Sequence, residues 1–453
     1  KEYGHAVVAV DDDPAKLNQT IHGVPVKGTL EDIPELCNRY GIHSIIIAIP
    51  TLKGSKLNHV IDLCVSTHCA VQLLSDPQLV GSGAPQQGAF RELNPADFLS
   101  RDEVTLDTDQ ISGYLTGKTV LVTGGGGSIG SELCRQVMRF KPGKLLIFDI
   151  YENCAYELLM ELQQKYGRDI PVTVLVGSIR DKKRLDEVFE TYHPTVVFHA
   201  AAHKHVPLME VSPAEAVKNN VLGTKNLLVS ASEHDVERFV QLSTDKAVNP
   251  TSVMGCTKRI CEMLIQTFAG NTDMKCVAVR FGNVLGSHGS VIPLFEAQIK
   301  KGGPVTLTDP NIERYFMTIP EAAQLVLQAG ALAESGNIYV LDMGEPVKIM
   351  DLAKQLIRFY GYEPGVNMEI KIVGLRPGEK LYEELMMDEE QDKMRRTQHN
   401  KIFVASPRNI DLAQFYEQLQ ALEAAAAHND EGVVKQLAAM IPTFTPTREN
   451  LKL

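Results

Sequence analysis

Three consecutive side chains, Thr244, Asp245 and Lys246, offer a hydroxyl, a carboxyl and an amine within one tripeptide. They follow "RFVQLS", an apolar run that predicts a buried strand, and doubly wound sheets bind ligands at the carboxyl ends of their strands. A carboxyl and an amine side by side can donate and abstract protons if burial or neighbouring charges adjust their pKa values. For an isolated tripeptide a charged turn is the simpler interpretation, so the surrounding motifs must decide.

A glycine-rich turn, "TGGGGSIG", lies upstream, with Gly124, Gly127 and Gly130 between an apolar strand and an amphipathic helix. Glycine lets the backbone approach a pyrophosphate, and the helix N-terminus attracts the negative charge. Ser128 and Ile129 belong to the same predicted cofactor-binding turn. A tight turn without a ligand is the alternative for the glycine triplet by itself.

An acidic residue, Asp149, closes the next predicted strand, at the place where a carboxylate accepts hydrogen bonds from the adenine-ribose hydroxyls. It would repel a 2′-phosphate, and no Arg or Lys lies between Ile150 and Lys165 to offset it. The sequence therefore favours NAD over NADP. Ala200, at the end of a later strand, is assigned to the same site. Asp181 is a candidate adenine contact, although an ordinary loop aspartate is equally consistent.

The composition is that of a globular protein with more than one domain: 453 residues, 44% hydrophobic and 22% charged. A net charge of −11 argues against a protein that coats nucleic acid or anionic membrane. The eight cysteines form no CxxC pair, which indicates a reducing compartment and no metal site. The apolar runs are shorter than the ~20 residues of a membrane helix. Because the chain opens without Met almost directly on a strand, we expect a fragment of a longer protein.

Alternating strands and helices predict an α/β fold whose centre is a doubly wound parallel sheet of the Rossmann type. We expect a partial α/β domain at residues 1–80, a linker at 81–117 and the NAD-binding domain at 118–293. Residues 294–453 are predicted to form a smaller substrate-binding lobe, interleaved with that domain, and C-terminal surface helices.

Seven motifs together resemble the nucleotide-sugar 4,6-dehydratases of the extended short-chain dehydrogenase superfamily. They are more narrowly similar to its long, membrane-anchored branch in bacterial polysaccharide and glycan biosynthesis, whose members act on UDP-N-acetylglucosamine. The first hundred residues are similar to the cytosolic Rossmann-like domain of that branch. The motifs are "TGGGGSIGSEL", "HAAAHKHVPLME", "NNVLGTKNL", "STDKAVNPTSVMGCTKR", "VRFGNVLGS", "TDPNIERYFMTI" and "GLRPGEKLYEEL".

The resemblance implies a location and a set of partners. The full-length protein would lie at the cytoplasmic face of the bacterial inner membrane, attached only through transmembrane helices that precede this fragment. Its ligand would be a UDP-sugar, and nucleic acid is not expected. Relatives commonly pair through helices that correspond to residues 214–232 and 252–270, which predicts a homodimer.

The implied reaction removes water across C5 and C6 of the sugar. Oxidation at C4 by NAD makes the C5 hydrogen acidic, water leaves from C6, and the stored hydride returns to C6. The resemblance assigns Thr244 to the 4-hydroxyl, Asp245 to protonation of the C6 leaving group and Lys246 to abstraction of the C5 proton. For these roles Lys246 must be neutral and Asp245 protonated.

Two positions, Met254 and His288, depart from the expected pattern. A Tyr normally stands four residues before the catalytic Lys, but this chain has Met254 before Lys258, which is typical of the long branch. Lys258 lies one helical turn further on and is expected to hold the nicotinamide ribose. The proton of the 4-hydroxyl could pass through Thr244 to water or to Lys258, and the sequence leaves both open. His288 stands where we expect Arg.

The diphosphate needs local cations because the protein is acidic, and guanidinium groups suit phosphate oxygens. Each such Arg taken alone is more simply a surface residue. Within the matching motifs, His205 is a weaker candidate for the wall of the site. The predicted substrate-binding residues are Lys204, Asn220, Arg280, Asn283, Arg314, Arg376 and Glu379.

Two other functions remain open. A nucleotide-sugar 4-epimerase also oxidises C4, but it would be expected to keep Tyr at position 254 and has no use for Asp245 and Lys246. A non-catalytic nucleotide sensor would be expected to lose one of these two residues, and both are present.

Overall fold

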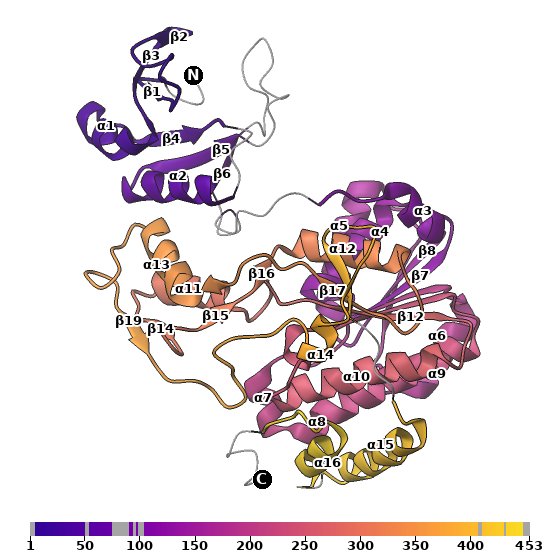
Figure 1. Cartoon of the computed structure of the whole chain (residues 1–453). Coiled ribbons are helices and arrows are strands. Elements are labelled where there is room, and N and C mark those ends of the chain that lie inside the picture. The colour runs from indigo at the N-terminus through magenta and orange to yellow at the C-terminus, as the bar shows by residue number, and fades with distance from the viewer. Residues whose placement is uncertain are drawn as a thin grey trace. The chain divides into compact units, whose positions relative to one another are not determined.

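A computed structural model describes residues 5–49, 54–74, 90–93, 97, 104–405, 410–429 and 432–446 (Figure 1). They divide into two compact units. The larger one comprises the described parts of Val104–His288, Asn311–Val347 and Gly374–Leu453. The smaller one comprises those of Lys1–Glu103, Gly289–Pro310 and Lys348–Val373. The predicted substrate-binding lobe is therefore split between the two units.

The larger unit is built on one sheet, whose described strands follow the order β20-β21-β17-β12-β11-β10-β7-β8-β9. The strands from β17 to β9 run parallel, whereas β21 and β20 are antiparallel additions at the β17 edge. This is the predicted doubly wound sheet. The strands are β7 (Thr119–Thr123), β8 (Lys144–Asp149), β9 (Val172–Val176), β10 (Val196–His199), β11 (Arg238–Leu242), β12 (Lys275–Arg280), β17 (Ile338–Leu341), β20 (Arg395–Arg396) and β21 (Ile402–Ala405).

Helices cover both faces of this sheet because its central strands are apolar on both sides. Val120 and Leu121 of β7 are fully buried and belong to two different cores, one on each face. In Figure 1, α3, α4, α5 and α12 lie on one face and α6, α9 and α10 on the other. These helices are α3 (Thr108–Leu115), α4 (Ser128–Arg139), α5 (Glu152–Tyr166), α6 (Lys182–Tyr192), α9 (Gly223–Glu233), α10 (Val253–Ala269) and α12 (Ile319–Ala331).

Helix α3 lies within the segment that the sequence predicted to be a linker. The Asp107 carboxylate accepts a backbone hydrogen bond at its start, which caps the helix. Ile111 and Leu115 are fully buried and join the core above the sheet. Two apolar residues one turn apart are a weak signal amid polar residues, and for that reason the helix was not predicted.

The C-terminal helices pack against part of the surface that the resemblance assigns to pairing between two copies. α15 (Leu412–Ala427) packs against α8 (Pro213–Ala216) and η4 (Val217–Leu222), and α16 (Val433–Met440) packs against α8 and α10. Their apolar side chains are buried in one core with α10, including Leu419 and Leu437. These helices bury part of the surface that the resemblance assigns to pairing, and the homodimer stays a prediction.

In its described residues, the smaller unit contains two three-stranded sheets, one two-stranded sheet and several helices. The predicted helices and strands of the first 80 residues are present where the structure describes them. No described helix is both long and apolar enough to cross a bilayer. The elements are β1 (Ala9–Val10), β2 (Thr20–Ile21), β3 (Val24–Gly28), η1 (Leu30–Asp32), α1 (Ile33–Tyr40), β4 (Ser44–Ile47), α2 (Gly54–Ser66), β5 (Ala70–Leu74), β6 (Phe90–Glu92), α11 (Val291–Lys300), β14 (Val305–Leu307), α13 (Ile349–Phe359) and β19 (Ile370–Ile372).

Candidate active site

The glycine turn packs the start of α4 tightly against the ends of β7 and β10. Gly124 has a φ of +67°, and a Cβ there would lie 2.7 Å from the amide nitrogen of Ala201. A Cβ at Gly130 would collide with the carbonyl oxygen of Gly124. Gly127 is the N-cap of α4. A side chain at Gly124 or Gly130 would therefore disrupt the turn. The backbone of Gly124, Gly126 and Gly127 lines the neighbouring cavity.

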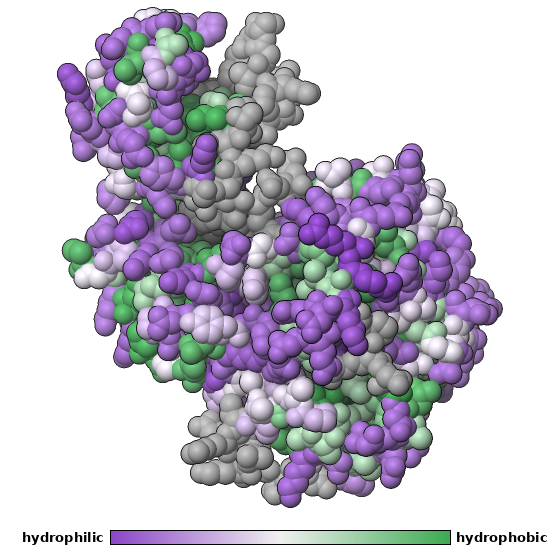
Figure 2. All heavy atoms as spheres, viewed as in Figure 1, coloured by the Kyte–Doolittle hydropathy of each residue, from purple (hydrophilic) through white to green (hydrophobic). Residues whose placement is uncertain are grey.

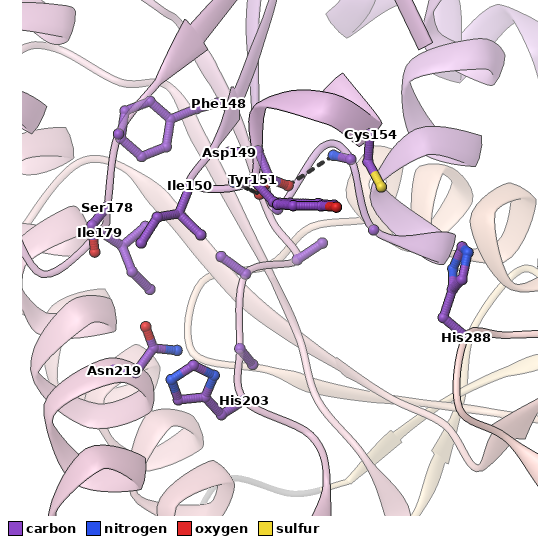
Figure 3. A pocket seen from close by; sticks show the side chains of 17 residues that line it. Phe148, Asp149, Ile150, Tyr151, Cys154, Ser178, Ile179, His203, Asn219 and His288 are labelled. Atoms are coloured by element: carbon purple, nitrogen blue, oxygen red, sulfur yellow. Dashed lines mark hydrogen bonds between the residues drawn. The ribbon is translucent and has the colours of Figure 1, made fainter. Parts of the chain in front are cut away.

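This cavity has a volume of about 410 Å³ and lies at the carboxyl ends of β7, β8 and β10 (Figure 3). Asp149 lines it at the end of β8, with its carboxylate accepting the amides of Gly126 at 2.8 Å and Tyr151 at 2.9 Å. Ala200 also lines the cavity, as predicted. Among the described residues, no Lys or Arg lines it.

Three of the predicted cofactor residues have structural contacts instead. The Ser128 hydroxyl accepts the backbone amide of His288 at 3.2 Å and also lies 3.2 Å from its ring Nδ1. Ile129 packs against the core beneath the turn. The Asp181 carboxylate caps α6 by accepting the amide of Arg184 at 3.0 Å. Asp181 does not line the cavity, so the structure corrects its assignment to adenine.

The predicted acid and base lie at the end of β11, on the short 3₁₀ turn η5 (Asp245–Ala247), which Thr244 caps. The Thr244 hydroxyl donates to Asp245 Oδ1 at 2.8 Å, and Lys246 Nζ donates to the same oxygen at 2.9 Å. Lys246 also donates to Asn283 Oδ1 at 3.3 Å, which brings a predicted substrate-binding residue into the cluster. Asp245 is fully buried.

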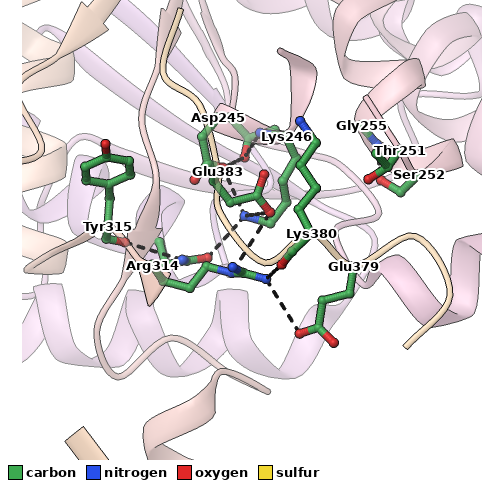
Figure 4. Close-up of polar contacts among 12 residues, drawn as sticks. Asp245, Lys246, Thr251, Ser252, Gly255, Arg314, Tyr315, Glu379, Lys380 and Glu383 are labelled. Carbon is green, nitrogen blue, oxygen red and sulfur yellow. Dashed lines mark hydrogen bonds and ion pairs between the residues drawn. The ribbon is translucent and has the colours of Figure 1, made fainter. Parts of the chain in front are cut away.

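A segment far along the chain, residues 376–385, completes the cluster, and we call it the strap. Arg314 on β15 (Glu313–Arg314) holds the strap by donating to the carbonyls of Lys380 at 2.7 Å and Leu381 at 3.1 Å. This places Glu383 Oε1 3.7 Å from Lys246 Nζ and 4.0 Å from Arg314 Nε (Figure 4). Arg314 is thus committed to the strap rather than open to a phosphate.

Two carboxylate oxygens in this cluster have no hydrogen-bond donor within the described structure. They are Asp245 Oδ2 and Glu383 Oε2, and both are buried. A buried polar atom without a partner costs on the order of 1–3 kcal/mol, and native proteins keep few of them. Such oxygens indicate that a ligand supplies the missing donors.

The protonation of the cluster differs from the sequence-based expectation. Burial disfavours the ammonium of Lys246, but the carboxylates of Asp245 and Glu383 more than offset it and raise the pKa of Lys246 above its usual value. Burial also raises the pKa of Glu383, although Lys246 opposes this. Without ligand, Lys246 is therefore an ammonium and not the neutral base that elimination needs.

Lys258 and Met254 lie side by side at the start of α10. Lys258 Nζ donates to the carbonyl of Leu242 at 2.6 Å, at the end of β11, and burial lowers the pKa of Lys258. Met254 is buried in the apolar core and has no proton to exchange.

Two predicted substrate-binding residues are instead buried structural groups. Arg280 is fully buried and donates to Glu262 at 3.0 Å and to Glu390 at 2.7 Å. Asn220 is also fully buried, where it accepts the amide of His203 at 2.8 Å and fixes the loop after β10. Neither side chain has a free face to offer a sugar nucleotide.

The remaining predicted residues lie nearer the surface. Lys204 donates to the carbonyl of His288 at 2.8 Å, and His205 is the N-cap of α7 (Val206–Val211). The Glu379 carboxylate accepts the backbone amide of Arg376 at 3.1 Å, and the Arg376 side chain is exposed. Arg376 is therefore the predicted phosphate ligand that the structure leaves accessible.

Sequence reasoning missed Glu383 and several residues of the cavity wall. "GLRPGEKLYEEL" contains three glutamates, and nothing local shows which of them the strap turns inward. The cavity-lining residues that were not predicted include Tyr151, Cys154, Ser178, Ile179, His203 and Asn219.

The chain belongs to the polysaccharide biosynthesis protein family, whose model matches residues 120–407. It is 53% identical over 384 residues to the capsular polysaccharide biosynthesis protein CapD of Staphylococcus aureus, covering 84% of this chain and 64% of the relative. It thus spans less than two thirds of that protein's length. The resemblance to the nucleotide-sugar dehydratases of the extended short-chain dehydrogenase superfamily is confirmed.

Relatives with named activities fall into two groups. A Campylobacter jejuni UDP-N-acetylglucosamine 4,6-dehydratase (inverting) is 33% identical over 271 residues, covering 59% of this chain and 76% of that enzyme. A Rickettsia rickettsii UDP-glucose 4-epimerase is 33% identical over 353 residues, covering 74% of this chain and 98% of that enzyme. The matched region is therefore of the nucleotide-sugar dehydratase and epimerase type.

Among solved structures, Pen from Bacillus thuringiensis is similar with a TM-score of 0.60 and 34% identity. The match covers 65% of this chain and 89% of Pen. The likeness confirms the α/β fold of the larger unit.

Proposed function

We propose that this protein is an NAD-dependent UDP-N-acetylglucosamine 4,6-dehydratase that forms a UDP-4-keto-6-deoxy sugar for bacterial polysaccharide or glycan biosynthesis. The observation that carries the proposal is the buried cluster of Thr244, Asp245 and Lys246. It combines a hydroxyl, a carboxyl and an amine with an Asp245 oxygen that lacks a donor. The dehydratase relative from Campylobacter jejuni supports the same reaction.

The cavity beside the glycine turn fits NAD. The turn is so tightly packed that a Cβ at Gly124 or Gly130 would collide with backbone, so glycine backbone borders the cavity, and Asp149 can accept the adenine-ribose hydroxyls. NADP fits less well because no Lys or Arg among the described lining residues would balance its 2′-phosphate. Gly124, Gly127, Asp149 and Ala200 would hold the cofactor. When bound, NAD would supply the oxidation at C4 and the matching reduction at C6, and it would not be consumed.

Thr244 offers a route for the proton of the 4-hydroxyl without a tyrosine. Its own hydroxyl already donates to Asp245 Oδ1 at 2.8 Å, so a proton taken up at Thr244 can pass to that carboxylate. Met254 cannot take part. Asp245 would thereby become the protonated acid that the next step needs.

Elimination then requires an acid at C6 and a base at C5. Asp245 would return its new proton to the C6 oxygen, which leaves as water, while Lys246 takes the C5 proton. The ammonium protons of Lys246 exchange with solvent, and Lys246 gives one of them back to C5 when C6 is reduced. The carboxyl and the amine share one hydrogen bond of 2.9 Å, so both face the same small volume. The atoms balance, since the sugar loses one water.

The sugar nucleotide needs cations that are not already committed. Arg376 is exposed, and Lys204 lies at the loop after β10, where its only protein acceptor among the described residues is the carbonyl of His288. Burial lowers the pKa of Lys204, so an anion nearby would favour its charged form. We assign these two side chains to the diphosphate.

A 4-epimerase is the second candidate, because the Rickettsia rickettsii relative carries that name. Mass spectrometry of the sugar nucleotide after incubation with the protein and NAD separates the two. A dehydratase gives a product lighter by one water, with no net change in reduced cofactor. A product of unchanged mass would refute the dehydratase assignment.

A further inference from the structure

Lys246 lies between two carboxyl groups rather than one. Asp245 accepts its hydrogen bond at 2.9 Å from one side, and the strap brings Glu383 to 3.7 Å. The Glu383 side chain is 4% exposed, and its Oε2 has no donor among the described residues. Contacts to the backbone hold the strap, including those of Arg314 and a hydrogen bond of 3.0 Å from Lys380 Nζ to the Val248 carbonyl.

A count of protons shows why the cluster needs a third group. In the route above, the proton of the 4-hydroxyl occupies Asp245, which then cannot also accept a proton from Lys246. Lys246 begins as an ammonium, because the two carboxylates raise its pKa against the effect of burial. An ammonium cannot abstract the C5 proton, so another group must first accept a proton from Lys246.

We propose that Glu383 is that acceptor: a positioning residue that takes a proton from Lys246 before elimination and returns it at the end of the cycle. An N–H bond of Lys246 breaks and an O–H bond forms on Glu383, and no electrons change hands. The inference rests on the proposed dehydratase function. It adds a third ionisable residue to the acid and base that the sequence motif supplies.

The charges and the burial around Glu383 set how readily it accepts a proton. The charged groups that face it are Lys246, Asp245, Arg314 and Lys380. Burial raises the pKa of Glu383 and the negative charge of Asp245 adds to this, while the three cations oppose it. A raised pKa makes the Glu383 carboxylate a better proton acceptor than an ordinary glutamate. Because the role needs ionised Glu383, activity should fall as the pH drops through that raised pKa.

Substitution Glu383→Gln tests the proposal, with Glu384→Gln as the matched control. Glu384 is the next residue and is 47% exposed, and its partners are Lys380 and Asn249. At neutral pH, E383Q should lose at least about 100-fold in turnover of UDP-N-acetylglucosamine, whereas E384Q stays within about threefold of the wild type. E383Q should regain rate as the pH rises and solvent deprotonates Lys246. Loss of rate that is equal at every pH, or no loss, would overturn the proposal.

Rescue with a small carboxylate separates proton transfer from a purely structural role. Glu383→Ala with added sodium acetate should recover at least about tenfold in rate, and sodium chloride should recover nothing. No difference between the two salts would contradict the proposal, provided that circular dichroism shows E383A folded. The wild type in the same assay keeps the two claims apart. If it releases no dehydrated product, the proposed function fails; if it dehydrates and E383Q matches it, only this inference fails.

Discussion

Two buried clusters of the larger unit carry the same charges but differ in whether every carboxylate oxygen has a hydrogen-bond donor. Each combines two cations with two carboxylates. In the first cluster, guanidinium groups donate directly to both carboxylates, with contacts such as 2.7 Å from Arg280 to Glu390. In the second, Glu383 approaches its cations only at 3.7 and 4.0 Å. The first cluster is Arg259, Glu262, Arg280 and Glu390; the second is Asp245, Lys246, Arg314 and Glu383.

The difference indicates which cluster serves the fold and which serves a ligand. Oxygens of Glu262 and Glu390 accept donors from the protein, so nothing remains for a substrate. Asp245 and Glu383 each keep one buried oxygen without a donor. A buried charged group is tolerated when the protein supplies all of its hydrogen-bond partners. A buried oxygen without a donor instead indicates a site that binds a ligand.

The largest effect is expected from Lys246→Met, which removes the base of the incomplete cluster. Turnover of UDP-N-acetylglucosamine should fall by about 100- to 10,000-fold, because no other described side chain is placed to abstract the C5 proton. The variant should also lose stability, because it leaves the buried Asp245 carboxylate without its cation, so circular dichroism must show it folded before the rates are compared. A loss below about tenfold would remove Lys246 from the chemistry.

Arg280→Met should act on the fold instead. It leaves Glu262 and Glu390 buried without their main cation, which costs about 3–5 kcal/mol of unfolding free energy in a denaturant titration. Arg135→Met is the control, because that arginine pairs with Glu161 on the surface and should cost less than about 1 kcal/mol. Equal costs for the two variants would contradict the structural role assigned to the first cluster.

The two glutamates should also show opposite pH dependence of stability. Burial works against the charge of Glu262, but Arg280 outweighs it and lowers the pKa of Glu262 to about 2, so its stabilisation is complete above its ordinary pKa and lost as the pH falls toward 2. The pKa of Glu383 is raised, so it stabilises the fold below its ordinary pKa and loses this as the pH rises.

Unfolding free energies of Glu262→Gln and Glu383→Gln across the acid range measure this contrast. The first variant should lose most stability at neutral pH and least in acid. Glu383→Gln should lose no stability at neutral pH, because there it removes a buried charge. If the loss of unfolding free energy changed with pH in the same direction in both variants, the proposed difference between the two clusters would be wrong.

The smallest effect concerns the cofactor cavity. Asp149→Asn removes a charged acceptor at the end of β8, and the dissociation constant for NAD measured by calorimetry should rise about tenfold. Asp181→Asn should leave it unchanged, because Asp181 caps α6 and asparagine caps equally well. A larger effect at position 181 would return that residue to the cofactor site.

What the sequence could predict follows from how local each feature is. The glycine turn, Asp149 and the Thr244 to Lys246 tripeptide are each encoded in one short segment at the end of a strand, so all three could be located from the sequence, although the roles in the tripeptide came from the family resemblance. Arg280 resembled a phosphate ligand because its partner Glu390 lies 110 residues away and no local pattern links them. Glu383 was missed for the same reason, since only the strap brings it to Lys246.

The fate of hydrogen at C5 tests the central claim most directly. UDP-N-acetylglucosamine is incubated with the protein and NAD in deuterium oxide, and the product is examined by proton nuclear magnetic resonance. Abstraction and return of the C5 proton by Lys246 predicts a 4-keto-6-deoxy product that carries deuterium at C5. A product with hydrogen retained at C5 and its 6-hydroxyl intact would contradict the account.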